Sequence, residues 1–249
     1  MSLRYERKYL VPNESMPALR RRLHPFVVHD PHSYITKKAI PQYTVRSIYL
    51  DSYDMECYIH KKSGIKLRRK LRIRGYNNNN DQSKVVFEIK RKTGDRLKKQ
   101  RSVFYFRDME NLIRYSNIED YILLNSHDGS NSMDNARRFF YHLRKKQYIP
   151  INLVVYEREA YFGRFDSGVR ITLDKNIRSK LFPEFRDLYD DHALKPFFNS
   201  HFIMEIKYYT ERMPVWARSI LQEFKLRNDA ISKYIIGYDV VRYNKNPIY

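Results

Sequence analysis

The sequence predicts an α+β protein in which about eight antiparallel strands form a β-barrel with a basic lumen, flanked by α-helices. Three observations lead to this prediction. At least seven segments alternate apolar and polar residues with the period of two that is typical of β-strands. The polar positions of these segments are rich in lysine and arginine. Between the segments lie stretches whose apolar residues recur at helical spacing.

The composition of the chain limits the classes of protein to which it can belong. Its 249 residues include 48 Lys+Arg and 28 Asp+Glu, for a formal charge of +20, and 42% are hydrophobic, which suffices for a substantial core. This charge favours an anionic partner, which could be nucleic acid, an acidic membrane face or a polyphosphorylated molecule. The single cysteine, Cys57, excludes an internal disulfide. Without a transmembrane segment or an apolar leader, we expect a cytoplasmic protein.

The strand pattern is visible from the start of the chain. At residues 3–11, Tyr9 and Val11 share one face, whereas Glu6 and Lys8 share the other. The predicted strands are residues 3–11, 45–50, 66–74, 84–92, 153–160, 169–174 and 203–208. The predicted helices, which would cover the apolar faces of these strands, are residues 12–26, 108–115, 133–146, 214–226 and 231–242. We predict one domain over residues 1–249, with a helical insertion at about residues 107–147.

The most basic part of the chain is a predicted hairpin. Residues 61–101 contain 16 Lys/Arg and three acids, a net charge of +13. Residues 66–74 and 84–92 each alternate cations with apolar residues, and the Asn-rich segment 77–81 between them is typical of a turn. An outward, solvated basic face is one interpretation of this alternation. An inward face that binds an anion is the other.

A repeated unit favours the inward interpretation. Glu6-Arg7-Lys8, Glu88-Ile89-Lys90 and Glu205-Ile206-Lys207 each place an acid and a lysine two residues apart, on the same side of a strand. Cations at this spacing repel each other by about 2.5 kcal/mol at an effective dielectric constant of about 20. A bound polyphosphate would reverse that repulsion. The carboxylates could then hold a divalent cation against phosphate oxygens.

Eight short motifs occur in order along the chain. They are Arg4-Tyr5-Glu6-Arg7-Lys8-Tyr9, Ser47-Ile48-Tyr49-Leu50-Asp51-Ser52, Arg72-Ile73-Arg74, Glu88-Ile89-Lys90-Arg91-Lys92 with Lys99-Gln100-Arg101, Tyr156-Glu157-Arg158-Glu159-Ala160, Val169-Arg170-Ile171-Thr172-Leu173-Asp174, Met204-Glu205-Ile206-Lys207-Tyr208 and Ser232-Lys233-Tyr234. Together they resemble a VTC-type polyphosphate polymerase domain of the triphosphate tunnel metalloenzyme (CYTH-like) superfamily. Members of that superfamily fold an antiparallel β-barrel into a tunnel for triphosphate.

The resemblance implies a set of site residues. Those expected to grip the triphosphate in catalysis are Lys8, Arg72, Arg74, Lys90, Arg158, Arg170 and Lys233. Further substrate-binding residues are Lys99, Arg101, Lys207, Lys92 and Tyr49. Glu205 falls on the position of a ligand for Mn²⁺ or Mg²⁺. Glu6 is a weaker metal candidate, because the superfamily often begins with Glu-x-Glu-x-Lys and Arg4 stands at the first of those positions.

The implied activity is polyphosphate polymerisation. A metal-dependent phosphotransferase of this kind moves the γ-phosphate of ATP to a growing inorganic polyphosphate chain, so ATP, polyphosphate and pyrophosphate or triphosphate are the expected partners. One alternative is a tripolyphosphatase or nucleoside triphosphatase that uses the same tunnel. Another is a non-catalytic polyanion-binding module. Nucleic acid is disfavoured as a ligand, because the aromatic residues fall on the apolar faces and form no stacking platform.

Overall fold

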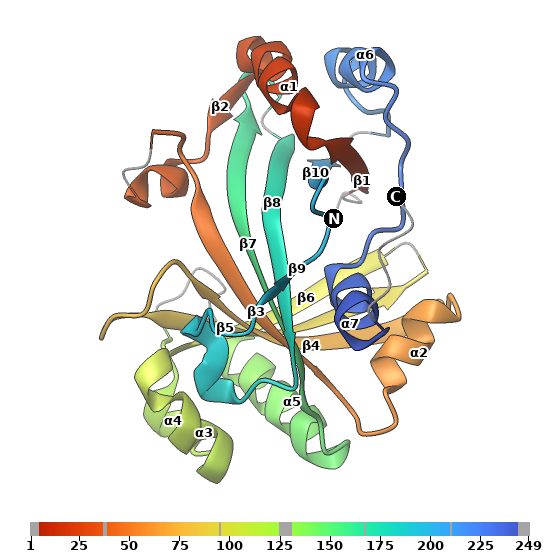
Figure 1. The fold of residues 1–249 in the computed structure, drawn as a ribbon. Helices are drawn as coiled ribbons and strands as arrows, with labels where there is room; N and C mark the ends of the chain where they lie inside the picture. Colours follow the sequence, from red (N-terminus) through yellow and green to blue (C-terminus); the bar gives the residue numbers. More distant parts are fainter. Residues whose placement is uncertain are drawn as a thin grey trace.

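One antiparallel sheet of ten strands dominates the fold (Figure 1). The computed structural model describes residues 5–36, 39–94, 96–124, 131–166, 168–209 and 211–243. The strands are β1 (Tyr5–Pro12), β2 (Val27–His29), β3 (Tyr43–Asp51), β4 (Leu67–Tyr76), β5 (Lys84–Thr93), β6 (Arg96–Tyr105), β7 (Ile149–Gly163), β8 (Arg170–Leu181), β9 (Lys195–Pro196) and β10 (His201–Tyr208). All predicted strands are therefore confirmed, although residues 3 and 4 of the first lie outside the described residues.

The sheet order brings distant parts of the chain together. The strands pair in the order β1-β10-β8-β7-β3-β4-β5-β6, with β2 on β7 and β9 on β8. The strands β4 to β6 cross the direction of β7 and β8, so the sheet curves around its inner face (Figure 1). In the described part of the chain, no pairing joins β1 to β6. The observed fold is therefore α+β with a curved antiparallel sheet, and the predicted closure into a barrel is not part of it.

Seven helices are described, and two groups of them cover the outer face of the sheet. They are α1 (Met16–Leu23), α2 (Glu56–Lys62), α3 (Met109–Tyr115), α4 (Ile118–Tyr121), α5 (Ser132–Lys145), α6 (Val215–Glu223) and α7 (Lys233–Tyr243). The first group is α3, α4 and α5, which follow β6 in the chain. They pack on β5 and β6 through a core that includes Phe87, Phe104 and Phe139. Against β1, β8 and β10, α1 and α6 pack through a second core with Leu19 and Ile220. These cores account for the apolar side of the strand alternation.

The helix predictions are confirmed with shifted ends. The predicted helix over residues 12–26 is a 3-10 turn at Asn13–Ser15, then α1, then a 3-10 turn at His24–Phe26. The predictions over 108–115, 133–146, 214–226 and 231–242 correspond to α3, α5, α6 and α7. None of the described helices is long and apolar enough to span a membrane.

A third apolar cluster lies on the inner side of the sheet, where α7 packs against β7 and β8. Gly237 allows this close approach, because a Cβ atom there would lie 3.1 Å from the Phe197 ring and from Ser179 Oγ. The Tyr234 hydroxyl donates to Asp51 Oδ2 at 2.6 Å. That carboxylate also accepts the Cys57 and Tyr58 amides at the start of α2, at 2.8 and 2.9 Å. One buried carboxylate thus fastens α7 and α2 to the end of β3.

Asp51→Ala should lower the free energy of unfolding by about 3 kcal/mol, because it leaves a buried hydroxyl and three amides, that of Ser52 included, without their charged acceptor. Urea unfolding measures the change. Asp54→Ala removes an exposed carboxylate three residues along and should change the free energy of unfolding by less than about 0.5 kcal/mol. Equal effects of the two substitutions would contradict the fastening role of Asp51.

Candidate active site

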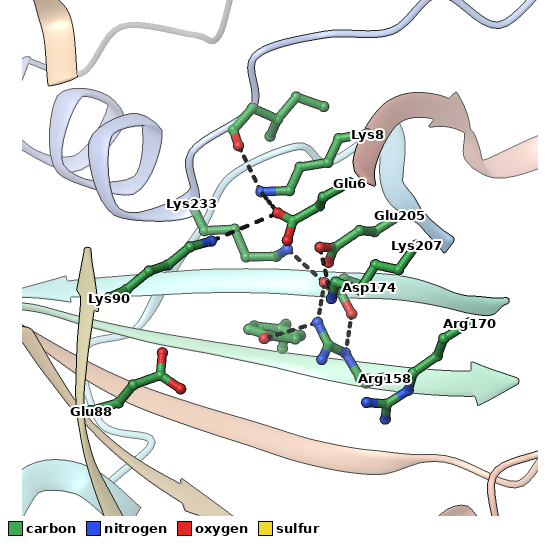
Figure 2. A network of polar contacts seen from close by, with 12 residues as sticks. Glu6, Lys8, Glu88, Lys90, Arg158, Arg170, Asp174, Glu205, Lys207 and Lys233 are labelled. Carbon is green, nitrogen blue, oxygen red and sulfur yellow. Dashed lines mark hydrogen bonds and ion pairs between the residues drawn. The ribbon is translucent and has the colours of Figure 1, made fainter. Parts of the chain in front are cut away.

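Charged side chains from several strands meet on the inner face of the sheet (Figure 2). On β1 and β10 the order of charges is complementary, since Glu6 pairs in register with Lys207 and Lys8 pairs with Glu205. Opposite charges that face each other across antiparallel strands stabilise the pairing. The Glu-x-Lys units of the two strands therefore form one block of alternating charge.

This block reaches across the interior. Lys207 Nζ lies 2.8 Å from Glu205 Oε1, and Lys8 Nζ lies 3.3 Å from Glu6 Oε1. Lys90 Nζ, on β5, lies 3.8 Å from the same Glu6 oxygen. The strands β1 and β5 are not neighbours in the sheet. The contact between Glu6 and Lys90 thus spans the inner space between the two halves of the curved sheet.

Asp174 organises a second group of cations beside Glu205 (Figure 2). Its carboxylate accepts two hydrogen bonds from Arg158, at 2.6 and 2.8 Å, and lies 2.6 Å from Lys233 Nζ at the start of α7. Both cations also lie over the Tyr156 ring, 5.2 and 4.8 Å from its centroid. Asp174 is fully buried. Burial raises its pKa, but Arg158 and Lys233 outweigh that effect and hold the pKa at about 2.

Glu88 holds a third group on β4, β5 and β6. Arg72 Nη2 lies 2.6 Å from one of its carboxylate oxygens, and Arg101 Nε donates to the other at 2.8 Å. Arg74, two residues beyond Arg72, donates to Ser47 Oγ at 3.0 Å. Burial raises the pKa of Glu88, but the arginines outweigh it and lower the pKa far below its usual value. The carboxylate is therefore ionised and keeps these guanidiniums on the inner face.

The lysines carry more positive charge than these carboxylates neutralise. Burial, with Lys207 and Lys90, lowers the pKa of Lys99 to about 7, and burial lowers that of Lys207 to about 8 although Glu205 raises it. The pKa of Lys90 is lowered as well, again by burial first. Burial also raises the pKa of Glu205, but Lys207 and Lys8 outweigh it and lower the pKa well below its usual value. A further anion beside these lysines would favour their charged forms.

The structure brings most of the predicted site residues together. Members of the connected inner groups are Glu6, Lys8, Arg72, Lys90, Arg101, Arg158, Glu205, Lys207 and Lys233, with Arg74, Lys92 and Lys99 on the same strand faces. Arg170, the first residue of β8, lies opposite Lys207 in register and binds Asp30 Oδ2 at 2.9 Å. Tyr49 is buried and stacks on Tyr234, with ring centroids 5.2 Å apart. Their roles in a reaction stay predictions.

Sequence reasoning missed several inner residues. Asp174 shares its strand face with Arg170, and Lys70 shares one with Arg72, so strand alternation could have identified both. Lys70 Nζ donates to Ser232 Oγ at 2.8 Å, next to Lys233. Tyr156 shares its strand face with Arg158, but an aromatic residue in a strand is normally part of an apolar core, so it was not predicted as a site residue.

The inner carboxylates suit a hard divalent cation. Burial and the nearby Glu205 carboxylate raise the pKa of Glu6, but Lys90 and Lys8 outweigh them and leave it lowered. Among the described residues, no group of three or more His, Cys, Asp or Glu side chains could hold a metal ion by itself. Mg²⁺ and similar ions commonly bind one or two carboxylates together with substrate phosphates. The donor set fits an ion of that kind.

Comparisons with known proteins show what this chain is similar to. A family model described as "VTC domain" matches residues 3–242. No curated protein sequence matches the chain. The structure resembles a putative adenylyl cyclase from Hippeastrum, HpAC1, which is described as revealing a dominant triphosphatase activity, with 15% identity, a TM-score of 0.52 and coverage of 98% of this chain and 97% of that one. It also resembles the PH1819 protein from Pyrococcus horikoshii OT3, with 15% identity, a TM-score of 0.44 and coverage of 97% and 100%. The likeness to HpAC1 concerns the fold alone.

The low pKa of Lys99 predicts that anion binding depends on pH. Lys99 is charged below about pH 7 and neutral above it, and a bound anion favours the charged form. Tripolyphosphate should therefore bind with proton uptake, and the contribution of Lys99 to its affinity should fall by about tenfold between about pH 6 and pH 8.5. Isothermal titration calorimetry in buffers of different ionisation enthalpy measures both quantities.

The matched control is Lys99→Arg. A guanidinium stays charged over the whole range, so this variant should take up fewer protons and lose affinity less steeply than the parent protein. Because both proteins are measured with the same ligand, protonation of the ligand contributes equally to both and drops out of the difference. The same pH profile and proton uptake in both proteins would contradict the prediction.

Proposed function

We propose a phosphoryl-transfer function on the premise that the chain belongs to the VTC domain family, whose model covers residues 3–242. The fold is that of CYTH-like triphosphate tunnel proteins. The specific activity that we propose is metal-dependent polyphosphate polymerisation, in which the γ-phosphate of ATP is transferred to a growing inorganic polyphosphate chain. The proposed site is a tunnel between the two halves of the curved sheet, lined by the charged groups described above.

One observation carries this proposal, namely that the buried and partly buried cations of the inner face outnumber the carboxylates among them. In the network of Figure 2, Lys8, Lys90, Arg158, Lys207 and Lys233 share Glu6, Asp174 and Glu205. A linear polyphosphate supplies negative charge along its whole length, so it matches an elongated lining better than a single compact anion does. Each phosphate oxygen could accept charge-assisted hydrogen bonds from these cations.

In the proposed reaction, the terminal phosphate of the acceptor chain attacks the γ-phosphorus of ATP. A new P–O–P bond forms, the bond to the bridging β,γ oxygen breaks, and ADP leaves with that oxygen. Such a transfer needs positioning and neutralisation of charge more than covalent catalysis. Arg158 and Lys233, fixed by Asp174, would supply charge that does not move during the reaction. Arg72 and Arg101, fixed by Glu88, would do the same along the neighbouring strands.

Mn²⁺ or Mg²⁺, bound by Glu205 with Glu6 and phosphate oxygens, would neutralise charge on the transferred group. The same carboxylates pair with Lys207, Lys8 and Lys90 without it. These pairings would keep the carboxylates ionised and oriented, and would leave the lysines able to turn toward phosphate oxygens. The chain thus provides both metal ligands and phosphate contacts within one block of side chains.

Incubation of the purified protein with ATP and Mn²⁺ should yield long polyphosphate, resolved by gel electrophoresis, together with an equivalent amount of ADP. A site that transfers a phosphoryl group to phosphate can also transfer it to water, so hydrolysis is the competing outcome. Free phosphate without chains would support a triphosphatase instead. Binding of polyphosphate without turnover of ATP would support a binding module.

Glu205→Gln should lower the rate of ATP turnover by about 100-fold, since loss of one metal ligand removes roughly 3 kcal/mol of transition-state stabilisation. It should retain or strengthen binding of tripolyphosphate measured without metal, because it removes a negative charge from the inner face. Glu14→Gln, at an exposed position after β1, is the matched control and should leave both unchanged. Turnover that survives Glu205→Gln would argue against a metal role for this residue.

A further inference from the structure

The outer face of the basic hairpin carries a cluster that the proposed reaction does not use. Arg69 on β4 and Arg91 on β5 are register partners, so their charges lie directly opposite each other. Both side chains contact His142 on α5, which covers this face of the sheet. Like charges in opposed positions destabilise a strand pair. Something other than the local fold is therefore needed to explain why two arginines meet there.

The hydrogen bonds within the cluster cannot all be made at once. Arg69 Nη1 lies 2.9 Å from His142 Nδ1, and Arg91 Nη2 lies 3.0 Å from His142 Nε2. A neutral imidazole has one acceptor nitrogen and one N–H donor, whereas a guanidinium has donors only. Whichever tautomer forms, one guanidinium N–H points at an imidazole N–H. The trio of Arg69, Arg91 and His142 consists of donors that lack a common acceptor.

The surroundings do not supply that acceptor. The charged groups that act on the cluster are Arg138 and Lys145, both on α5, and Glu56 on α2. Glu56 is already engaged, because its Oε2 accepts the Tyr148 hydroxyl at 3.3 Å and lies 3.5 Å from Lys146 Nζ.

Two groups of the trio are buried. Arg91 Nε is buried and has no hydrogen-bond partner. His142 is only 9% exposed, and burial together with Arg69 and Arg91 lowers its pKa to about 4. The ring is therefore neutral at pH 7.

We infer that Arg69, Arg91 and His142 form a binding site for a phosphate group on the outer face of the sheet, separate from the inner network. A tetrahedral oxyanion accepts hydrogen bonds from both guanidinium forks and from an imidazole N–H at the same time, and it neutralises the opposed charges. The site lies on the other side of the strands from Lys70 and Lys90, whose side chains point inward. The phosphate group comes either from free orthophosphate or from a segment of a polyphosphate chain.

The imidazole of His142 serves as a reporter that the inner network cannot mimic. In ¹⁵N-labelled protein, long-range ¹H–¹⁵N spectra follow the ring through a pH titration, with orthophosphate or tripolyphosphate added at constant ionic strength. A bound anion should raise the pKa of His142 by about one unit or more. A shift with orthophosphate identifies the free ion as sufficient, and a shift with tripolyphosphate alone identifies the chain. No shift with either ligand at millimolar concentration overturns the proposal.

Variants distinguish specific binding at this site from nonspecific binding of anions to a basic protein. Arg69→Gln with Arg91→Gln should abolish the shift, while the amides can still donate to or accept from the ring and so preserve its packing. Arg21→Gln removes an exposed arginine from α1 and should leave the shift intact. Should the double variant fail to fold, Arg69→Lys keeps the charge but loses the planar fork, and should weaken phosphate binding by about tenfold. An unchanged shift in the folded Gln variant, or an unchanged affinity for phosphate in the Lys variant, contradicts the assignment.

Discussion

The crowding of like charge on the inner face of one sheet is the constraint on which the structure depends. Cations at alternate positions of a strand, held in a medium of low dielectric constant, repel each other strongly. The chain meets this constraint by placing Glu6, Glu88, Asp174 and Glu205 among them, so that each carboxylate binds two cations or lies opposite one in register. The carboxylates reduce the repulsion without removing it. The remaining excess is what makes the face attractive to a polyanion.

The rest of the fold holds this face in place. The apolar side of each strand packs on helices in two separate cores, which fixes the register that sets Glu6 opposite Lys207. The inner cluster around α7 serves a different purpose. It places Lys233, which is on a helix, against Asp174 on the sheet, and Asp51 fastens that helix through Tyr234. Packing and electrostatics are therefore linked through α7.

Strand alternation made much of this architecture predictable. The repeated Glu-x-Lys units place both side chains on one face, which follows from a period of two and needs no tertiary information. The contact of Glu6 with Lys90 could not be predicted, since it depends on how far the sheet curves. Closure of that sheet was predicted but is not among the observed pairings. Strand alternation places Asp174 on the inner face. Its hydrogen bond with Lys233 could not be predicted, because Lys233 lies on a helix 59 residues further along the chain.

The contacts of β1 with the C-terminal part of the chain have a consequence for the order of folding. Contacts of Lys8 with Ile231 and Asn228 close loops of 223 and 220 residues. Such contacts form slowly, because the chain loses the entropy of loop closure before it gains the energy of the contact. The hairpin of β4 and β5, in contrast, can form locally. During synthesis its cations therefore emerge before their partners on β1 and β10 are assembled around them. A nascent chain with this order of strands would expose the basic hairpin to the RNA of the ribosome. Correct folding therefore requires that the hairpin be shielded soon after it is synthesised.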